Sequence, residues 1–295
     1  RASTPPGDTN DRSANAPTVP SRHESGRSNV EDNSSPEVFT LTPGVLRGWA
    51  RSGFRFLAWA VGGYYLICAV LILSYRWVDP PTTGVQIQRT VSAWFDGDEY
   101  ETSYEPVPLS AIDDDLELAV VAAEDTRFFQ HTGIDWEAVG EAIEDNQERG
   151  IVYRGGSTIT QQLAKNLFQT THSSFVRKGF EVPLTYLIEL ILPKERILEL
   201  YLNVIEWGPS VFGIQAAAQH HYGISAASVG RYRAAALAAC IPNPLERTPR
   251  RMNWYARIIL QRMYQLESIE PRFSSQWLPH QPPSSSTSSP IAIHD

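Results

Sequence analysis

The sequence predicts a mainly α-helical protein in which one membrane-spanning helix precedes a single folded domain. The first observation is an uncharged, largely apolar run of 20 residues at positions 56–75. The second is that apolar residues between positions 80 and 272 recur mostly at helical spacing, three or four residues apart. The third is that strand-like sequence, rich in β-branched and aromatic residues, is confined to positions 83–104.

The apolar run is long enough to cross a bilayer as a helix. At ~1.5 Å per residue it spans about 30 Å, the thickness of the hydrocarbon core. Arg47, Arg51 and Arg55 precede it, and positive charge marks the cytoplasmic side of a membrane helix. We therefore expect a transmembrane helix at 54–75, with the larger C-terminal part outside the cytoplasm. A buried core helix would normally carry a polar stripe, and a cleaved signal peptide would have a shorter apolar stretch.

The overall composition is that of a folded protein with two tails. The net charge of −8 argues against a nucleic-acid partner, and a hydrophobic content of 42% is enough to form a core. Two cysteines cannot build a disulfide framework. Positions 1–45 and 273–295 are rich in Ser and Pro and poor in aliphatic periodicity. We expect a disordered cytoplasmic tail at 1–45 and a second disordered tail at 273–295.

The folded domain, expected at positions 80–272, carries repeated helix signals. Ser110 with Asp113 is typical of a capped helix start, and Leu116 and Val120 follow one turn apart. Only 83–104 is expected to contain a strand. The helices that the pattern predicts lie at about 111–125, 136–150, 159–167, 177–192, 194–203, 212–222, 229–240 and 252–266.

The first segment that could carry chemistry follows the helix expected at 111–125. Glu124 and Asp125 stand where the apolar helix ends, and Arg127, Phe128 and His131 follow within seven positions. An acid set against apolar surface loses hydration, which raises its pKa toward the range of a general base. The alternative is a solvated helix end with a structural histidine.

The second segment begins at a Gly-Gly pair. Ser157 opens the helix expected at 159–167, whose free backbone N–H groups suit a phosphate. Polar residues on one helical face, ending in a lysine, should point away from the core; they are Thr158, Gln161, Gln162 and Lys165. The alternative is an ordinary glycine turn with a serine cap, and the Gly-Lys-Ser/Thr ending of a P-loop is missing.

Two later segments are less informative by themselves. Arg177 and Glu181 form an i, i+4 pair, which usually only stabilises a solvated helix face. Residues 194–203 read as a scaffold helix opened by a proline. The pair His220 and His221 is tempting as a metal site, but adjacent side chains on a helix point to different faces.

Five motifs that follow one another along the chain identify a protein family more specifically than any one of them does. They are Glu-Asp-x-x-Phe-x-x-His-x-Gly at 124–133, Gly-x-Ser-Thr-Ile-x-Gln-Gln at 155–162, Arg-Lys-x-x-Glu at 177–181, Lys-x-Arg-Ile-Leu-x-x-Tyr-Leu-Asn at 194–203 and Phe-Gly-x-x-Ala-Ala-Ala at 212–218. Over roughly residues 76–265 the chain resembles the peptidoglycan glycosyltransferases of glycosyltransferase family 51. With one anchor and no transpeptidase domain after the last motif, it is expected to be a monofunctional member.

The resemblance implies a lysozyme-like helical lobe with a smaller membrane-apposed lobe, located at the outer face of the bacterial inner membrane. It implies transfer of a growing glycan from undecaprenyl diphosphate to the 4-hydroxyl of lipid II, with inversion to a β-1,4 bond. Glu124 matches the general base, and Glu181 matches a second glutamate that helps position the donor diphosphate. A divalent cation, Mg²⁺ or Mn²⁺, is allowed at Glu181, and no organic cofactor is expected. Other cell-wall synthesis or division proteins are allowed as partners.

The resemblance also implies a set of substrate-binding residues. Because a diphosphate leaving group gathers negative charge, cations placed beside it stabilise its departure, and no separate acid is needed. We expect Arg177 and Lys178 to form such a cationic clamp. The full set comprises Asp125, Arg127, Phe128, His131, Ser157, Thr158, Gln161, Gln162, Lys165, Asn166, Arg177 and Lys178.

The chain departs from the family pattern at three places, and two other functions remain open. Arg233 stands where a glutamate commonly precedes an Ala pair, and residues 222–224 lack the usual aromatic-plus-lysine continuation. Pro183 lies inside the helix expected at 177–192, so that helix should kink or begin after Arg177. The alternatives are a catalytically silent membrane-anchored scaffold of cell-wall synthesis and a lysozyme-like lytic enzyme.

Overall fold

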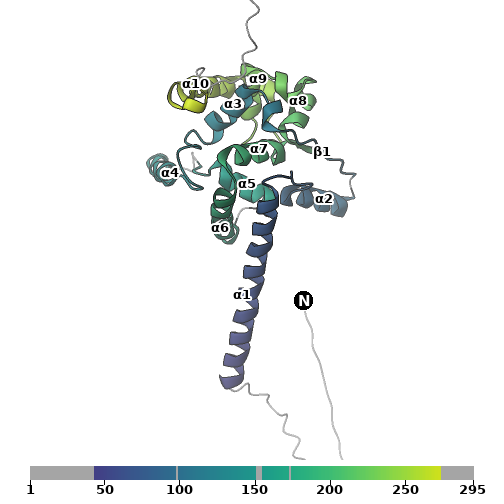
Figure 1. The fold of residues 1–295 in the computed structure, drawn as a ribbon, viewed down its shortest axis with the longest axis vertical. Helices are drawn as coiled ribbons and strands as arrows, with labels where there is room; N and C mark the ends of the chain where they lie inside the picture. The colour runs from purple at the N-terminus through teal and green to yellow at the C-terminus, as the bar shows by residue number, and fades with distance from the viewer. Residues whose placement is uncertain (1–42, 98, 151–154, 173, 274–295) are drawn as a thin grey trace, which may run out of the picture. The chain divides into compact units, whose positions relative to one another are not determined.

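The computed structural model describes residues 43–97, 99–150, 155–172 and 174–273. The chain divides into two compact units, Arg1–Gly53 and Phe54–Asp295. The described part is mainly helical, as predicted (Figure 1). Of the two expected tails, 1–42 and 274–295 lie outside the described residues.

Helix α1 (Pro43–Ser74) contains the predicted membrane segment. Residues Arg51–Ser74 are long and apolar enough to cross a membrane, and only 11% of the most apolar window is buried against the rest of the protein. The C-terminal end of the helix, in contrast, is part of the core through Cys68 and Ile72. Arg196 fastens this end, because its side chain donates to the Tyr75 carbonyl at 2.7 Å.

A strand was expected within 83–104, and the structure has one at the end of that stretch, β1 (Ser103–Tyr104), but residues 84–96 form helix α2 (Gly84–Asp96). A capping box starts this helix: the Thr83 hydroxyl accepts from the Gln86 N–H at 3.2 Å, and the Gln86 side chain accepts from the Thr83 N–H at 3.0 Å. Gly97, in the left-handed region, ends it. The apolar residues that suggested a strand recur at helical spacing and form one exposed stripe, consisting of Ile87, Val91, Trp94 and Phe95.

The sheet is small and includes two strands that the sequence analysis did not predict. β1 (Ser103–Tyr104) pairs in parallel with β3 (Val211–Phe212), and β3 pairs antiparallel with β2 (Glu206–Gly208). Because β3 takes residues 211–212, the helix expected at 212–222 begins later, as α8 (Ile214–Tyr222).

The helices pack in two groups around one core (Figure 1). In the first group, α3 (Asp114–Glu124) packs against α9 (Arg231–Ala238) and α10 (Asn253–Ile269). In the second group, α5 (Ile159–Phe168) packs against α2, α6 (Phe175–Ile191) and α7 (Lys194–Val204). The remaining described helices are α4 (Trp136–Arg149) and the short turns Leu109–Ala111, Ala226–Ser228, Pro249–Arg251 and Pro271–Phe273.

Two other helices also begin at residues that differ from the prediction. α3 begins three residues later than expected, because Asp113 caps it by accepting from the Asp115 N–H at 3.0 Å. α6 begins before Arg177, because the Ser174 hydroxyl accepts from the Arg177 N–H at 3.1 Å. Pro183 therefore lies inside α6, where burial of neighbours such as Leu184 and Ile188 offsets its cost. The kink expected there stays a prediction.

Gly213 joins β3 to α8 in a conformation that excludes a side chain. Its φ is +83°, and a Cβ there would lie 2.6 Å from the carbonyl oxygen of Asn203. Its N–H also donates to the Ile205 carbonyl at 3.1 Å, so the backbone cannot move away without losing that bond. The position ties the end of α7 to the sheet.

We predict that Gly213→Ala lowers the free energy of unfolding by about 3 kcal/mol, since strained φ and a backbone clash add. The measurement is the thermal midpoint of the detergent-solubilised full chain. Gly223→Ala is the matched control, because Gly223 has φ +69° but a Cβ added there would meet nothing within 4 Å. Equal losses in the two variants would contradict the clash.

Candidate active site

Glu124 is the last residue of α3, and it is partly buried. Residues 116–122 of the same helix are buried, so Glu124 lies at the edge of the core. One oxygen accepts a hydrogen bond from the Gln162 amide at 2.7 Å. Burial raises the pKa of Glu124, while the Gln162 bond and the nearby Lys165 charge oppose the rise. The carboxylate thus has the environment that the sequence predicted for a general base.

Gln162 is itself held by a residue from the segment that the sequence analysis treated as scaffold. The Tyr201 hydroxyl on α7 donates to the Gln162 carbonyl oxygen at 2.8 Å. Tyr201 is completely buried. A chain of hydrogen bonds therefore runs from α7 through α5 to the end of α3, which joins the two helical groups.

Asp125 is a structural neighbour of Glu124. Its side chain accepts from the Ile159 N–H at 3.0 Å, at the N-terminus of α5, and pairs with the His131 Nε2 at 3.0 Å. The carboxylate therefore satisfies a free N–H and meets the positive end of the α5 dipole. Asp125 therefore fixes α5 relative to α3.

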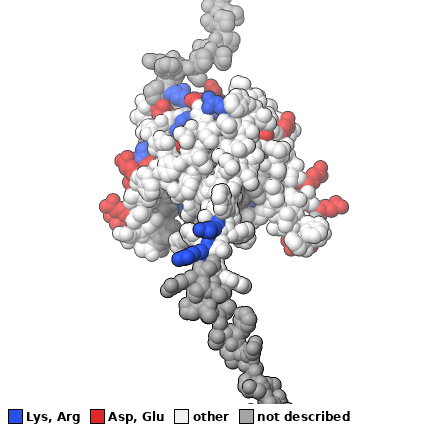
Figure 2. All heavy atoms as spheres, turned by 60° about the horizontal axis from the view of Figure 1, so that its bottom comes forward, with Lys and Arg blue, Asp and Glu red and all other residues white. Residues whose placement is uncertain are grey.

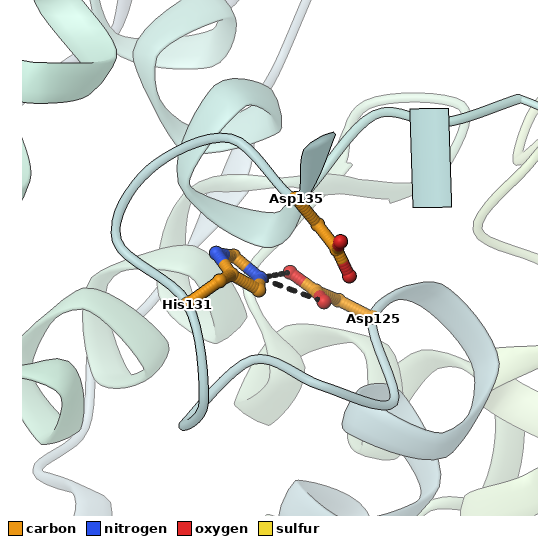
Figure 3. Close-up of side chains that lie close together, drawn as sticks. All are labelled: Asp125, His131 and Asp135. Carbon is orange, nitrogen blue, oxygen red and sulfur yellow. Dashed lines mark hydrogen bonds and ion pairs between the residues drawn. The ribbon is translucent and has the colours of Figure 1, made fainter. Parts of the chain in front are cut away.

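The carboxylates of Asp125 and Asp135 and the His131 ring lie within 4.8 Å of one another (Figure 3). Their hydrogen bonds account for this cluster without an ion. Asp135 accepts from Arg127 at 2.8 Å and from the Ala138 N–H at 2.9 Å, at the start of α4. Because both carboxylates are already engaged, the donor set does not fit a metal centre.

Two further residues of the first motif are not brought to the Glu124 carboxylate. Arg127 turns toward α4, where it pairs with Asp135 and Glu137. Phe128 is fully buried, with the Lys194 ammonium 4.4 Å from its ring centroid. Both side chains hold the loop after α3 in place. Their expected role in binding substrate stays a prediction that these contacts do not favour.

Only part of the polar stripe predicted for α5 points away from the core. Thr158 and Gln161 are buried and form a capping box, in which the Gln161 side chain accepts from the Thr158 N–H at 3.0 Å. The Thr158 hydroxyl also donates to the Gly133 carbonyl at 2.6 Å. Helix capping explains both residues, because the start of α5 is inside the protein and its N–H groups need partners.

Glu181 on α6 is surrounded by cations. Its carboxylate, 2% exposed, pairs with Arg177 at 2.9 Å and with Lys178. The Lys178 ammonium also donates to the Ser157 hydroxyl at 3.2 Å, which links the start of α5 to α6. The Arg177 guanidinium donates to the Gln169 side chain at 3.0 Å, but its Nε is buried without a partner among the described residues.

Lys165 stands between the two glutamates. Burial lowers the pKa of its ammonium, and the charges of Glu181 and Glu124 oppose that shift. Among the described residues it forms no ion pair or side-chain hydrogen bond. A partly buried cation without an anionic partner is costly, so an anionic ligand would satisfy it.

A cavity of about 260 Å³ opens beside Lys165. Gln162 and Asn166 line it from α5, and residues 241–245 line another side. Arg89 on α2 and Glu206 on β2 also line it and form an ion pair at 2.7 Å. The sequence does not predict this pair. Arg89 lies in the stretch where a strand was expected, and Glu206 meets it only through tertiary packing.

The departures at Arg233 and residues 222–224 are neighbours in space. The Arg233 guanidinium lies over the Tyr222 ring, 5.4 Å from its centroid. The Tyr222 hydroxyl donates to the Arg233 carbonyl at 3.3 Å. A cation–π contact therefore joins α8 to α9 where ion pairing had been in doubt, away from Glu124.

We predict that Asp125→Ala lowers the free energy of unfolding by about 3 kcal/mol, because it leaves the Ile159 N–H and His131 buried and unpaired. The measurement is chemical unfolding of the detergent-solubilised chain. Asp114→Ala is the control, since Asp114 is exposed in the first turn of α3. If both variants lost the same small amount, Asp125 would not fix α5.

Comparisons with known proteins agree with the motif pattern. A family model described as Transglycosylase matches residues 88–267. The chain is similar to proteins named biosynthetic peptidoglycan transglycosylase. One from Pseudomonas fluorescens (strain SBW25) is 47% identical over 190 residues, which cover 64% of this chain and 78% of the relative. One from Stutzerimonas stutzeri (strain A1501) is 42% identical over 233 residues, which cover 76% of this chain and 94% of the relative.

Proposed function

The chain belongs to the transglycosylase family and is a peptidoglycan glycosyltransferase, and from that premise we propose that it polymerises lipid II into glycan strands. In this reaction Glu124 removes the proton from the 4-hydroxyl of lipid II. The freed oxygen attacks the anomeric carbon of the growing glycan, and the bond to undecaprenyl diphosphate breaks. Attack opposite the leaving group gives a β-1,4 bond with inversion.

The observation that carries this proposal is that the partly buried Glu124 carboxylate contacts α5, the helix that also carries Lys165, a cation without an ion pair among the described residues. Gln162 donates to Glu124 at 2.7 Å. Lys165 lies three residues along α5, so it falls on the same side of that helix. A desolvated carboxylate accepts a proton more readily than a solvated one, because burial disfavours its charged form. α5 therefore holds the base, Glu124 at the end of α3, through Gln162, and offers Lys165 as a phosphate ligand to the same substrate pair.

We assign the leaving diphosphate to the cations around Glu181. Lys165, Arg177 and Lys178 gather around one carboxylate, so the cluster carries an excess of positive charge. Preplaced cations stabilise charge that develops as the glycosidic bond breaks. Glu181 holds Arg177 and Lys178 in position, and Lys165 forms no ion pair among the described residues.

A divalent cation held at Glu181 does not fit these contacts. Both carboxylate oxygens are shared with Arg177 and Lys178, and cations surround the site. Mg²⁺ and Mn²⁺ prefer several oxygen ligands, of which this cluster offers one carboxylate. No step of the proposed reaction depends on a metal.

The contacts of α1 support a lipid-linked substrate. The Tyr65 hydroxyl on α1 donates to the Phe180 carbonyl at 3.2 Å, so α6 runs beside the outer part of the anchor. At the start of α6, Phe175 is 98% exposed and Val176 is also exposed. Apolar side chains beside a membrane helix are stable in lipid. The cationic cluster of α6 would then lie at the level of lipid headgroups.

Helix α2 presents a second apolar surface. Trp94 and Phe95 are exposed at its C-terminal end, and Trp77 is exposed just after the anchor. The face in Figure 2 is largely uncharged, with acidic side chains at its margins. These features favour a lobe apposed to the membrane, because aromatic side chains concentrate at the membrane–water interface.

The location follows from the same anchor. Arg51 and Arg55 at the start of the apolar span favour a cytoplasmic location for that end, because positive charge marks the cytoplasmic side of a membrane helix. We therefore propose a single-pass protein of the bacterial inner membrane with its catalytic domain outside the cytoplasm. Partners among cell-wall synthesis or division proteins stay a prediction.

The lytic and scaffold alternatives are less well supported. A lytic enzyme cleaves finished glycan and has no diphosphate to bind, so the cationic cluster would have no function. A scaffold without catalytic activity would gain nothing from the partial burial of Glu124, which costs free energy because the carboxylate loses hydration. Both alternatives predict that the wild-type chain makes no glycan from lipid II.

We predict that Glu124→Gln lowers polymerisation at least about 100-fold, the lower range for loss of a general base. The measurement is extension of labelled lipid II on a glycan-resolving gel. Glu117→Gln is the control, because Glu117 is also a buried acid of α3 but pairs with Arg272. Long glycan from the Glu124 variant would rule out its assignment as base.

We predict that Lys165→Met weakens binding of undecaprenyl diphosphate about 10- to 100-fold, as expected for loss of a charge-assisted hydrogen bond. Calorimetric titration of the detergent-solubilised full chain measures this. Arg177→Ala should weaken binding less, because Glu181 already pairs with Arg177. Lys194→Met is the control, since Lys194 pairs with Glu189. Unchanged binding in both the Lys165 and Arg177 variants would contradict the cationic clamp.

A further inference from the structure

Tyr201 belongs to a motif, residues 194–203, to which the proposed reaction gives no role. It lies on α7, is completely buried, and is hydrogen-bonded to Gln162. Its hydroxyl donates at 2.8 Å to the Gln162 carbonyl, and the Gln162 amide donates at 2.7 Å to Glu124. The three side chains come from three helices, so only the fold brings them together.

We propose that Tyr201 is a positioning residue whose hydroxyl fixes the orientation of the Gln162 amide, so that Gln162 always presents an N–H to the Glu124 carboxylate. The inference rests on the proposed role of Glu124 as base. It concerns how that base is held ready, and it assigns Tyr201 no contact with substrate.

The orientation follows from the donors and acceptors available. A side-chain amide has a carbonyl at one end and an NH₂ group at the other, and it can turn over. Turned over, the Gln162 carbonyl would face the Glu124 carboxylate, and two acceptors would meet. The Tyr201 proton would also be left in the core without its acceptor, a cost of about 1–3 kcal/mol. Tyr201 therefore locks the orientation that suits an ionised Glu124.

Tyr201 is suited to this task because it does not lose its proton. Burial, together with the nearby charges of Glu124 and Asp125, raises the pKa of its hydroxyl well above the ordinary value of 10.0. The hydroxyl remains a donor at every pH where the enzyme works. A donor that titrated would release the amide.

The consequence for Glu124 has a definite sign. Burial raises its pKa and Asp125 adds to the rise, while the Gln162 bond, Lys165 and Arg247 lower it. Loss of the Gln162 bond would leave the ionised form less stable, so the pKa would rise further. Glu124 would then be protonated, and inactive as a base, over a wider range of pH.

The test is Tyr201→Phe in the full chain, which removes one oxygen atom. We expect the acid limb of the pH profile of kcat/KM for lipid II to move up by about one pH unit, which is about tenfold in rate on that limb. The plateau at higher pH should stay within about threefold of the wild type. Tyr104→Phe is the matched control, because its hydroxyl also donates to a carbonyl, that of Pro80 at 2.8 Å, outside the site.

A second measurement does not require turnover. Infrared difference spectra, with Glu124→Gln as the blank, follow protonation of the Glu124 carboxyl directly. We expect its midpoint to rise in Tyr201→Phe and to fall when Tyr201 is replaced by 3-fluorotyrosine, a stronger donor. If these infrared shifts occur as expected but the wild type makes no glycan, the proposed function alone would fail.

Three results would overturn the inference. One is an unchanged midpoint in the infrared titration of Tyr201→Phe. Another is a rate loss of equal size at every pH, which would make Tyr201 a packing residue. The third is an equal shift in Tyr104→Phe, which would mean that loss of any buried hydroxyl disturbs the site. The 3-fluorotyrosine variant keeps the test valid if Tyr201→Phe does not fold.

Discussion

The structure depends on one hydrogen bond: the Gln162 amide donates to the carboxylate of Glu124, which lies at the edge of the apolar core. Burial of an acid is costly unless partners compensate. Here the compensation comes from Gln162 at 2.7 Å and from the nearby Lys165 charge. Both lie on α5, so the position of that helix decides whether Glu124 can act as a base. The burial of α3 and the capping of α5 both serve this arrangement.

Helix α5 is held at its start by contacts from α3 and from α6. Asp125 accepts from the Ile159 N–H at its start, and the Thr158–Gln161 capping box closes the same turn. On the side of α6, Lys178 bridges Ser157 and Glu181. Because α6 also contacts the anchor through Phe180 and Tyr65, the cationic cluster stands at a fixed height along α1. The anchor thus contributes to the geometry of the site as well as to its location.

The spacing of residues along the sequence predicted the features that form within a single helix. The membrane helix, α3 with Glu124 at its end, and the Arg177–Glu181 pair all follow from spacing along one helix. α2 was predicted as a strand because its apolar residues are β-branched and aromatic, although the Thr83–Gln86 capping box was present in the sequence. Tyr201 and Gln162 meet across 39 residues, and Arg89 and Glu206 across 117, so only packing brings them together. Thr158 and Arg127, which were predicted to bind substrate, form hydrogen bonds within the protein, and that role stays a prediction.

The central claim is that Glu124 at the end of α3 and Lys165 on α5 act as base and phosphate ligand on the same pair of lipid-linked substrates. A structure of the full-length Glu124→Gln variant with a lipid-linked glycan donor and lipid II bound would test it most directly. The account predicts a diphosphate oxygen within hydrogen-bond distance of the Lys165 ammonium and the lipid II 4-hydroxyl beside residue 124. A diphosphate bound away from Lys165, or an acceptor hydroxyl that does not approach residue 124, would contradict it.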